Sequence, residues 1–189
     1  FIDIGTNGEL VIGNKDFLIA AAGAAGPALE GGISKYGMRA SDGAIDSVKI
    51  INNKITYTTI NNKKARGICG SGIVDLIAQL FLNKWIDFSG TLIPENSTSI
   101  VKINDEYVVE YVTKEESFNG ESLIFTQSDI NQFLKTKSAA NTMVAYLLEE
   151  IGLDINELDY FYTAGAFGTH IDVKSAVTIG MYPDLPESK

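Results

Sequence analysis

The chain has 189 residues, of which 45% are hydrophobic and 21% are charged, and its 15 basic and 24 acidic residues give a formal net charge of −9. These proportions are typical of an ordinary globular domain and argue against disorder. An acidic surface repels nucleic-acid phosphates and anionic lipid headgroups, so we expect neither nucleic acid nor membrane as a partner.

Several other classes are also excluded. No apolar run approaches the roughly 18 to 20 residues that cross a bilayer, and the start of the chain does not read as a signal peptide, so we expect a cytoplasmic protein. The single cysteine, Cys69, and the single histidine, His170, leave no internal disulfide, no zinc site of several such ligands and no iron–sulfur cluster in this segment. The chain opens on Phe1 within an expected strand, which indicates a fragment.

A β-hairpin is predicted at the start of the chain. The apolar runs 1–5 and 9–13 flank Asn7 and Gly8, the strongest short hairpin signal that a sequence offers. The tip can direct unpaired backbone N–H groups and the Thr6 hydroxyl toward a phosphate oxygen, and glycine allows close approach. We therefore predict a phosphate-binding turn made by Asp3, Gly5, Thr6, Asn7 and Gly8.

The carboxylate of Asp3 gives this turn its second predicted role. A carboxylate repels phosphate but can hold a hydrated Mg²⁺ ion, because hard cations prefer oxygen ligands. An ordinary hairpin whose tip requires glycine is the alternative. Asp3 and Thr6, together with a second glycine turn far along the chain, favour the site.

The next segments complete a three-stranded antiparallel meander. A turn at 13–16 leads into an apolar run at 17–22. The run of small residues that follows, 23–32, has Glu30 as its only charge. Residues 44–60 alternate as a β-hairpin does, and we interpret them as an insertion.

A helix is predicted from Ser71, because apolar residues recur at helical spacing at Ile73, Leu76, Ile77, Leu80 and Phe81. This pattern predicts that Asp75 and Gln79 lie off the buried face. The helix starts in a third glycine turn, where Gly70 and Ser71 either accept an anion on free N–H groups or form a plain helix start with Ser71 as the N-cap. The sequence leaves both readings open.

The second half is predicted as two more helices with strands between them. Residues 85–120 form a β-rich insertion with a strand near 107–112, and Trp85 is expected to pack at the end of the preceding helix. A short strand at 123–125 then feeds a long helix capped by Thr126 or Ser128 and stopped by Gly152.

The last strand, 158–163, leads into another glycine turn, which we predict to be the second wall of the nucleotide pocket, made by Gly165, Ala166, Phe167 and Gly168. Asp172 caps a final helix that ends at Gly180, and residues 183–189 are expected to be an unstructured tail. The element order βββ-α-β-α-β-α predicts an α/β fold with a mixed sheet flanked by helices.

These motifs resemble one half of the actin-like ATPase superfamily, which includes acetate and sugar kinases, heat-shock chaperones and actin and has a ribonuclease H-like core. More specifically, the chain resembles the C-terminal ATPase domain of reductive activators of corrinoid proteins. The segments that carry the closer resemblance are 1–14, 25–31, 37–40, 66–72 and 172–183. Residues 1–182 would then be the second half of such an ATPase.

The resemblance implies an ATP- and Mg²⁺-dependent activator that delivers a low-potential electron to the cobalamin of a corrinoid protein. The electron carrier would be a 2Fe-2S domain outside this segment, and the preceding ATPase half of the same polypeptide would supply the other wall. Two positions depart from the family pattern, Ala166 in place of a second glycine and Leu29 in place of an aromatic residue.

Other interpretations stay open. Glu9 and Glu30 are candidates for positioning water or closing on magnesium, or they satisfy loop amides. A small-molecule kinase of the same superfamily would share both turns, and a docking module, including a homodimer, would use nucleotide only to set its shape. Cys69 is expected to be a packed residue, and His170 a surface residue.

Overall fold

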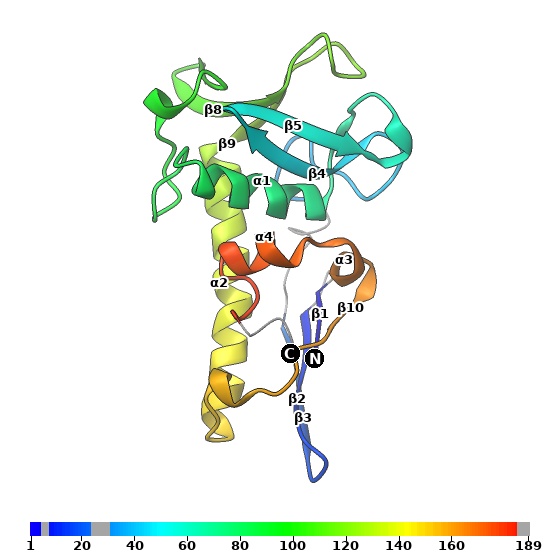
Figure 1. Cartoon of the computed structure of the whole chain (residues 1–189), viewed down its shortest axis with the longest axis vertical. Coiled ribbons are helices and arrows are strands. Elements are labelled where there is room, and N and C mark those ends of the chain that lie inside the picture. The colour runs from blue at the N-terminus through cyan, green and yellow to red at the C-terminus, as the bar shows by residue number, and fades with distance from the viewer. Residues whose placement is uncertain (5–7, 24–30, 185–189) are drawn as a thin grey trace.

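The computed structural model describes residues 1–4, 8–23 and 31–184. The predicted turn residues Gly5, Thr6 and Asn7, and Glu30 in the run of small residues, lie outside these ranges. Three β-sheets and the helices between them make up the described chain (Figure 1). The strands are β1 (Ile2–Ile4), β2 (Gly8–Gly13), β3 (Leu18–Gly23), β4 (Ala44–Ile51), β5 (Lys54–Thr59), β6 (Gly67–Ile68), β7 (Ile100–Ile103), β8 (Glu106–Val112), β9 (Leu123–Thr126) and β10 (Thr163–Ala164).

Within the described ranges, four α-helices and three short 3-10 helices connect these strands. The α-helices are α1 (Gly70–Leu82), α2 (Gln127–Glu150), α3 (Gly165–His170) and α4 (Val173–Thr178), and the 3-10 helices are η2 (Ile60–Asn62), η3 (Pro94–Asn96) and η4 (Ile155–Glu157). No helix among the described residues has both the length and the apolar character needed to cross a membrane.

The first sheet has the order β10-β1-β2-β3 and is mixed, as predicted. Strands β1, β2 and β3 form the expected antiparallel meander, and β10 pairs with β1 in parallel. Alternate residues point to opposite faces of a strand, so Ile2, Leu10 and Ile12 are buried on one face, where α2 contacts the sheet. The opposite face carries exposed residues, among them Glu9 and Leu18.

The second sheet has the order β5-β4-β6 and contains the predicted hairpin. Its turn residues, Asn52 and Asn53, have φ angles of 51° and 61°, a left-handed conformation that asparagine tolerates better than most residues. Helix α1 packs directly on β4. At Gly72 a Cβ atom would overlap the carbonyl oxygen of Ile45, so only glycine allows this close approach.

Ser71 as the N-cap of α1, part of one of the two readings that the sequence left open, is wrong. The N-cap is Cys69, without a side-chain capping hydrogen bond. Ser71 lies in the first turn, where its hydroxyl donates to the carbonyl oxygen of Asp46 at 2.9 Å.

The prediction that Asp75 and Gln79 lie off the buried face is also wrong. Asp75 is only 5% exposed, and its Oδ2 accepts a hydrogen bond from the N–H of Val48 at 3.1 Å. Gln79 Oε1 accepts from the N–H of Ile50 at 2.9 Å. Strand β6 covers only Ala44 and Ile45 at the start of β4, so the helix supplies the acceptors that these buried N–H groups further along β4 need.

The third sheet, β7-β8-β9, is antiparallel and feeds α2. Strands β8 and β9 were predicted, whereas β7 was not. The predicted cap is confirmed, because Thr126 and Asp129 form a reciprocal capping box with hydrogen bonds of 2.9 and 3.1 Å. Trp85 packs as expected, with no exposed surface, and its Nε1 donates to Asn53 Oδ1 at 2.9 Å.

The predicted strand at 158–163 is much shorter in the structure. Only Thr163 and Ala164 pair with β1, which is itself three residues long. The 3-10 helix η4 lies just before the predicted strand, at residues 155–157. The final helix, α4, begins as predicted, because Asp172 Oδ1 accepts from the N–H of Ser175 at 2.8 Å. Gly180 follows the helix with a φ of 65°.

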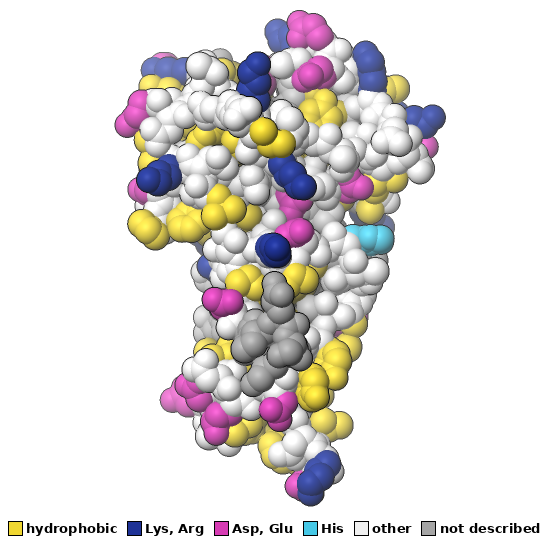
Figure 2. All heavy atoms as spheres, viewed as in Figure 1, with side chains coloured by type: hydrophobic (Ala, Val, Ile, Leu, Met, Phe, Trp, Pro, Cys, Tyr) yellow, Lys and Arg dark blue, Asp and Glu magenta, His cyan; other side chains and the backbone are white. Residues whose placement is uncertain are grey.

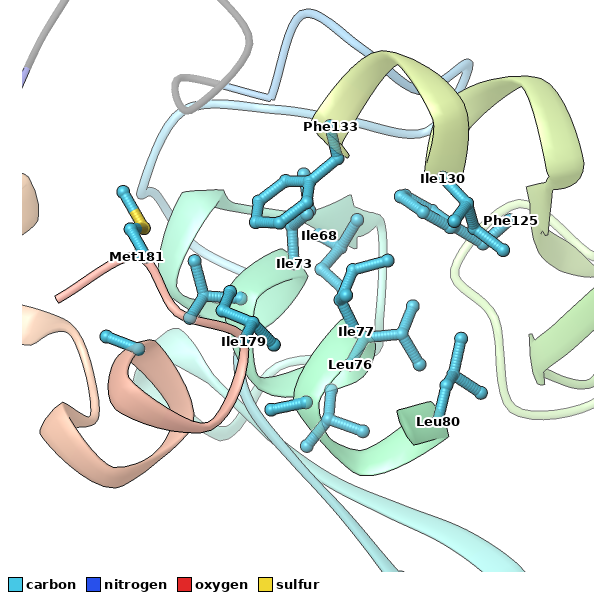
Figure 3. Close-up of a cluster of buried hydrophobic side chains, with 14 of the residues drawn as sticks. Ile68, Ile73, Leu76, Ile77, Leu80, Phe125, Ile130, Phe133, Ile179 and Met181 are labelled. Atoms are coloured by element: carbon cyan, nitrogen blue, oxygen red, sulfur yellow. The ribbon is translucent and has the colours of Figure 1, made fainter. Parts of the chain in front are cut away.

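The core is centred on α1, which is buried on nearly all sides. Figure 3 shows side chains of α1 between the start of α2 and the segment that follows α4. Its labelled members are Ile68, Ile73, Leu76, Ile77, Leu80, Phe125, Ile130, Phe133, Ile179 and Met181. This core holds α4 against α1, which itself packs on β4 of the second sheet.

Candidate functional site

The parallel pairing of β1 with β10 brings the first and last glycine motifs together. Asp3 lies beside Ala164 in this register, so its neighbour along the chain is Gly165. Gly165 has a φ of +77°, and a Cβ atom there would overlap Oδ1 of Asp3. The carboxylate therefore stands directly against a glycine that no other residue replaces without strain.

A second carboxylate lies on the same face of the sheet. Glu9 is directly opposite Asp3 in the antiparallel β1–β2 ladder, and paired residues point to one face. Like charges at such positions destabilise a sheet. A bound cation would offset this repulsion, and carboxylate oxygens are ligands that Mg²⁺ accepts. Gly8, next to Glu9, is buried at the start of β2.

The predicted second wall is a strand-to-helix junction. Gly165, Ala166, Phe167 and Gly168 form the first part of α3. Gly168 lies close to Thr163, since a Cβ atom there would be 3.1 Å from the Thr163 Cβ. The hydroxyl of Thr169 donates to the carbonyl oxygen of Gly165 at 2.9 Å, which ties the junction together.

The third glycine turn is packed rather than open. Gly70 and Ser71 are buried where α1 meets β4. The Ser71 hydroxyl is already used by Asp46, and Cys69 is buried beside it with its thiol donating to the Ile45 carbonyl oxygen at 3.3 Å. These contacts support the reading of this turn as a helix start.

The family-like segment 37–40 has a structural position that sequence reasoning did not assign. The N–H of Met38 donates to the Ile68 carbonyl oxygen, and the N–H of Ile68 donates to the Tyr36 carbonyl oxygen, each at 2.9 Å. The segment thus covers the free edge of β6. Gly37 is required there because a Cβ atom would overlap the carbonyl oxygen of Gly31.

An apolar cavity of about 540 Å³ lies apart from the two carboxylates. It lies between the C-terminal half of α2 and residues 180–183, and Ile2, Val144 and Leu148 line it. Ile2 and Asp3 are consecutive residues of one strand, so their side chains point to opposite faces of the first sheet. The cavity is therefore on the α2 side, and the candidate site is on the other. His170 is exposed at the end of α3, as predicted.

The surface view shows how charge is distributed. On the face drawn in Figure 2, Lys and Arg side chains lie singly among other residues.

Comparison with known proteins gives consistent results. Residues 1–189 match the family model described as the C-terminal domain of RACo, the ASKHA domain. The corrinoid activation enzyme RamQ of Eubacterium limosum is 40% identical over 192 residues, covering 97% of this chain and 32% of RamQ. The Co(II) methylated amine-specific corrinoid protein reductase of Methanosarcina barkeri is 27% identical over 203 residues, covering 96% of this chain and 34% of that protein.

A solved structure gives the same result. The protein described as reductive activator for corrinoid,iron-sulfur protein superposes with a TM-score of 0.91 at 39% identity, covering 97% of this chain and 30% of that one. The chain thus spans about a third of the length of these relatives. The predicted actin-like α/β fold is confirmed, and the chain belongs to the family of RACo C-terminal ASKHA domains.

Proposed function

We propose that this chain is the nucleotide-binding half of an ATP-dependent reductive activator, a protein that returns the cobalamin of a corrinoid protein to its reduced, active state. The observation that carries the proposal is the contact between Asp3 and Gly165, which joins the two predicted nucleotide motifs at one end of the first sheet. The names of the relatives indicate corrinoid proteins as the partner class.

The residues at this position fit a magnesium nucleotide. Asp3 and Glu9 would hold Mg²⁺, directly or through its water shell, because both carboxylates point to the same face. The bound ion would neutralise charge on the phosphate oxygens. Glycine at 165 leaves room beside the Asp3 carboxylate, and Glu9, which is exposed, is suited to orient a water molecule.

The remaining parts belong to the longer polypeptide. The chain spans about a third of its relatives, so we propose that the other ATPase wall and a 2Fe-2S domain lie elsewhere in it. Reduction of cobalamin is uphill for ordinary donors. A ligand shifts a conformational equilibrium by its differential affinity for the two states. A nucleotide that binds one interdomain arrangement more tightly than another can therefore couple its hydrolysis to binding and release of the corrinoid protein.

Calorimetry of Mg-ATP binding to a full-length activator carrying this chain tests the proposal. We expect Asp3→Asn to weaken binding at least tenfold, or about 1.4 kcal/mol. The control is Asp16→Asn, which removes an exposed carboxylate in the β2–β3 turn that pairs with Lys15. Asp16→Asn should bind as the wild type does. Equal affinity in Asp3→Asn and wild type would contradict the site.

A nucleotide site divided between two halves of the polypeptide leads to a further expectation. The 189-residue chain alone should bind Mg-ATP far more weakly than the full-length protein, because it supplies one wall. Equal affinity of the two would refute a pocket shared between halves. A second assay separates an activator from a docking module. With a reductant present, a full-length activator should cause an ATP-dependent loss of the Co(II) absorbance of a corrinoid protein, whereas a docking module should not.

A further inference from the structure

Among residues 1–4, 8–23 and 31–184, strand β3 is an unpaired edge of the first sheet. It ends the strand order, and it pairs with β2 in an unbroken register from Gly8 opposite Gly23 to Gly13 opposite Leu18. Its sequence, Leu-Ile-Ala-Ala-Ala-Gly, contains no charge and no proline. Natural proteins usually blunt such edges with lysine, proline or a bulge, and β3 has none of these.

The hydrogen-bonding direction of each β3 residue follows from the ladder. The N–H of Val11 donates to the carbonyl oxygen of Phe1, the residue just before β1. Val11 therefore does not bond toward β3, and its partner Ala20 does not bond toward β2. By the same alternation Leu18 and Ala22 also direct their N–H and C=O groups away from β2. Among the residues that the structure describes, no strand pairs with this edge.

The same three residues are exposed. Leu18 is 74% exposed, and Ala20 and Ala22 are also in the exposed class. In Figure 1 the β2–β3 hairpin extends past the rest of the chain, away from α1 and the second sheet. The described part of the chain therefore leaves Leu18, Ala20 and Ala22 accessible to another strand.

We propose that β3 pairs antiparallel with β3 of a second copy of this chain, about a two-fold axis through Ala20. In this register Ala20 lies opposite Ala20 and Leu18 lies opposite Ala22, so each outward N–H and C=O group of these residues finds a partner. A two-fold axis normal to the sheet keeps the open face of both copies on one side. The small side chains bring no like charges together, which suits self-pairing.

Cysteine cross-linking tests the register. Directly opposite residues that exchange hydrogen bonds have Cα atoms about 5.5 Å apart, within the roughly 4.4 to 6.8 Å that a disulfide spans. Ala20→Cys should therefore form an intermolecular disulfide under mild oxidation. Ala22→Cys is the matched control, because four residues of offset separate the two copies of position 22 by about 13 Å along the strands. Cys69 is buried and should not compete.

The mass in solution gives an independent test. We expect analytical ultracentrifugation of a full-length activator carrying this chain to show a concentration-dependent dimer, and Ala20→Lys to weaken the dimer at least tenfold by placing two lysines opposite each other. Ala139→Lys makes the same change at an exposed position of α2 and should leave the dimer intact. A wild-type monomer at about 100 μM, or a dimer that Ala20→Lys does not weaken, would overturn the proposal. Cross-linking of Ala22→Cys as fast as that of Ala20→Cys would overturn the register.

Discussion

Replacing Gly165 by alanine should destabilise the chain for two separable reasons. The φ of +77° is in the left-handed region, where an L side chain costs roughly 1–2 kcal/mol. The new Cβ atom would also overlap Oδ1 of Asp3, and overpacking of this kind costs about 1–3 kcal/mol. The free energy of unfolding should therefore fall by about 2–5 kcal/mol.

A double-mutant cycle separates the two reasons. Asp3→Ala removes the carboxylate atoms that the new Cβ would meet, so Gly165→Ala in that background should cost only the backbone part. The expected coupling is about 1–3 kcal/mol, well beyond the roughly 0.5 kcal/mol scatter of independent sites. Gly152→Ala is the matched control, because Gly152 has a φ of +67° and open space around it. Gly152→Ala should lower the free energy of unfolding only by the backbone part.

Urea unfolding followed by the fluorescence of Trp85 measures these differences. Trp85 is the single tryptophan of the chain and is fully buried, so its emission reports global unfolding. Costs of Gly165→Ala and Asp3→Ala that add within about 0.5 kcal/mol would refute the contact on which the candidate site depends.

Two further predictions concern buried polar groups. Asp75→Ala should lower the free energy of unfolding by about 2 kcal/mol or more in the same assay, because the buried Val48 N–H loses its acceptor, whereas Asp75→Asn keeps an acceptor and should stay within about 1 kcal/mol of wild type. Burial raises the pKa of Tyr182 to about 12, above its ordinary value near 10, so its contribution to stability is complete below pH 10 and is lost as pH rises from 10 to 12. Tyr182→Phe should reduce the slope of stability against pH in this window; an unchanged slope would contradict the burial of the hydroxyl.

Local signals in the sequence predicted the elements that depend on local chemistry. The caps at Thr126 and Asp172 and the stops at Gly152 and Gly180 were correct, because each depends on a few neighbouring residues. The meander of β1, β2 and β3 was also correct, since its turns are short.

Two predictions that depended on distant neighbours failed. A helical pattern marks Asp75 and Gln79 as surface residues, but β4 has N–H groups that only these side chains satisfy. The length of β10 is set by β1, which lies at the other end of the sequence. The two glycine motifs led us to expect that Asp3 and Gly165 lie close together, and they do. The register between β1 and β10, however, does not follow from any periodicity in the sequence.

The β1–β10 pairing joins positions about 160 residues apart. Closing so long a loop costs roughly 4–5 kcal/mol of chain entropy. Packing of the intervening residues must offset this cost before the two strands pair. The paired motifs thus assemble only when almost the entire domain has folded. A ligand held there would raise the melting temperature of the whole domain by mass action, and a distant core substitution would weaken its apparent affinity.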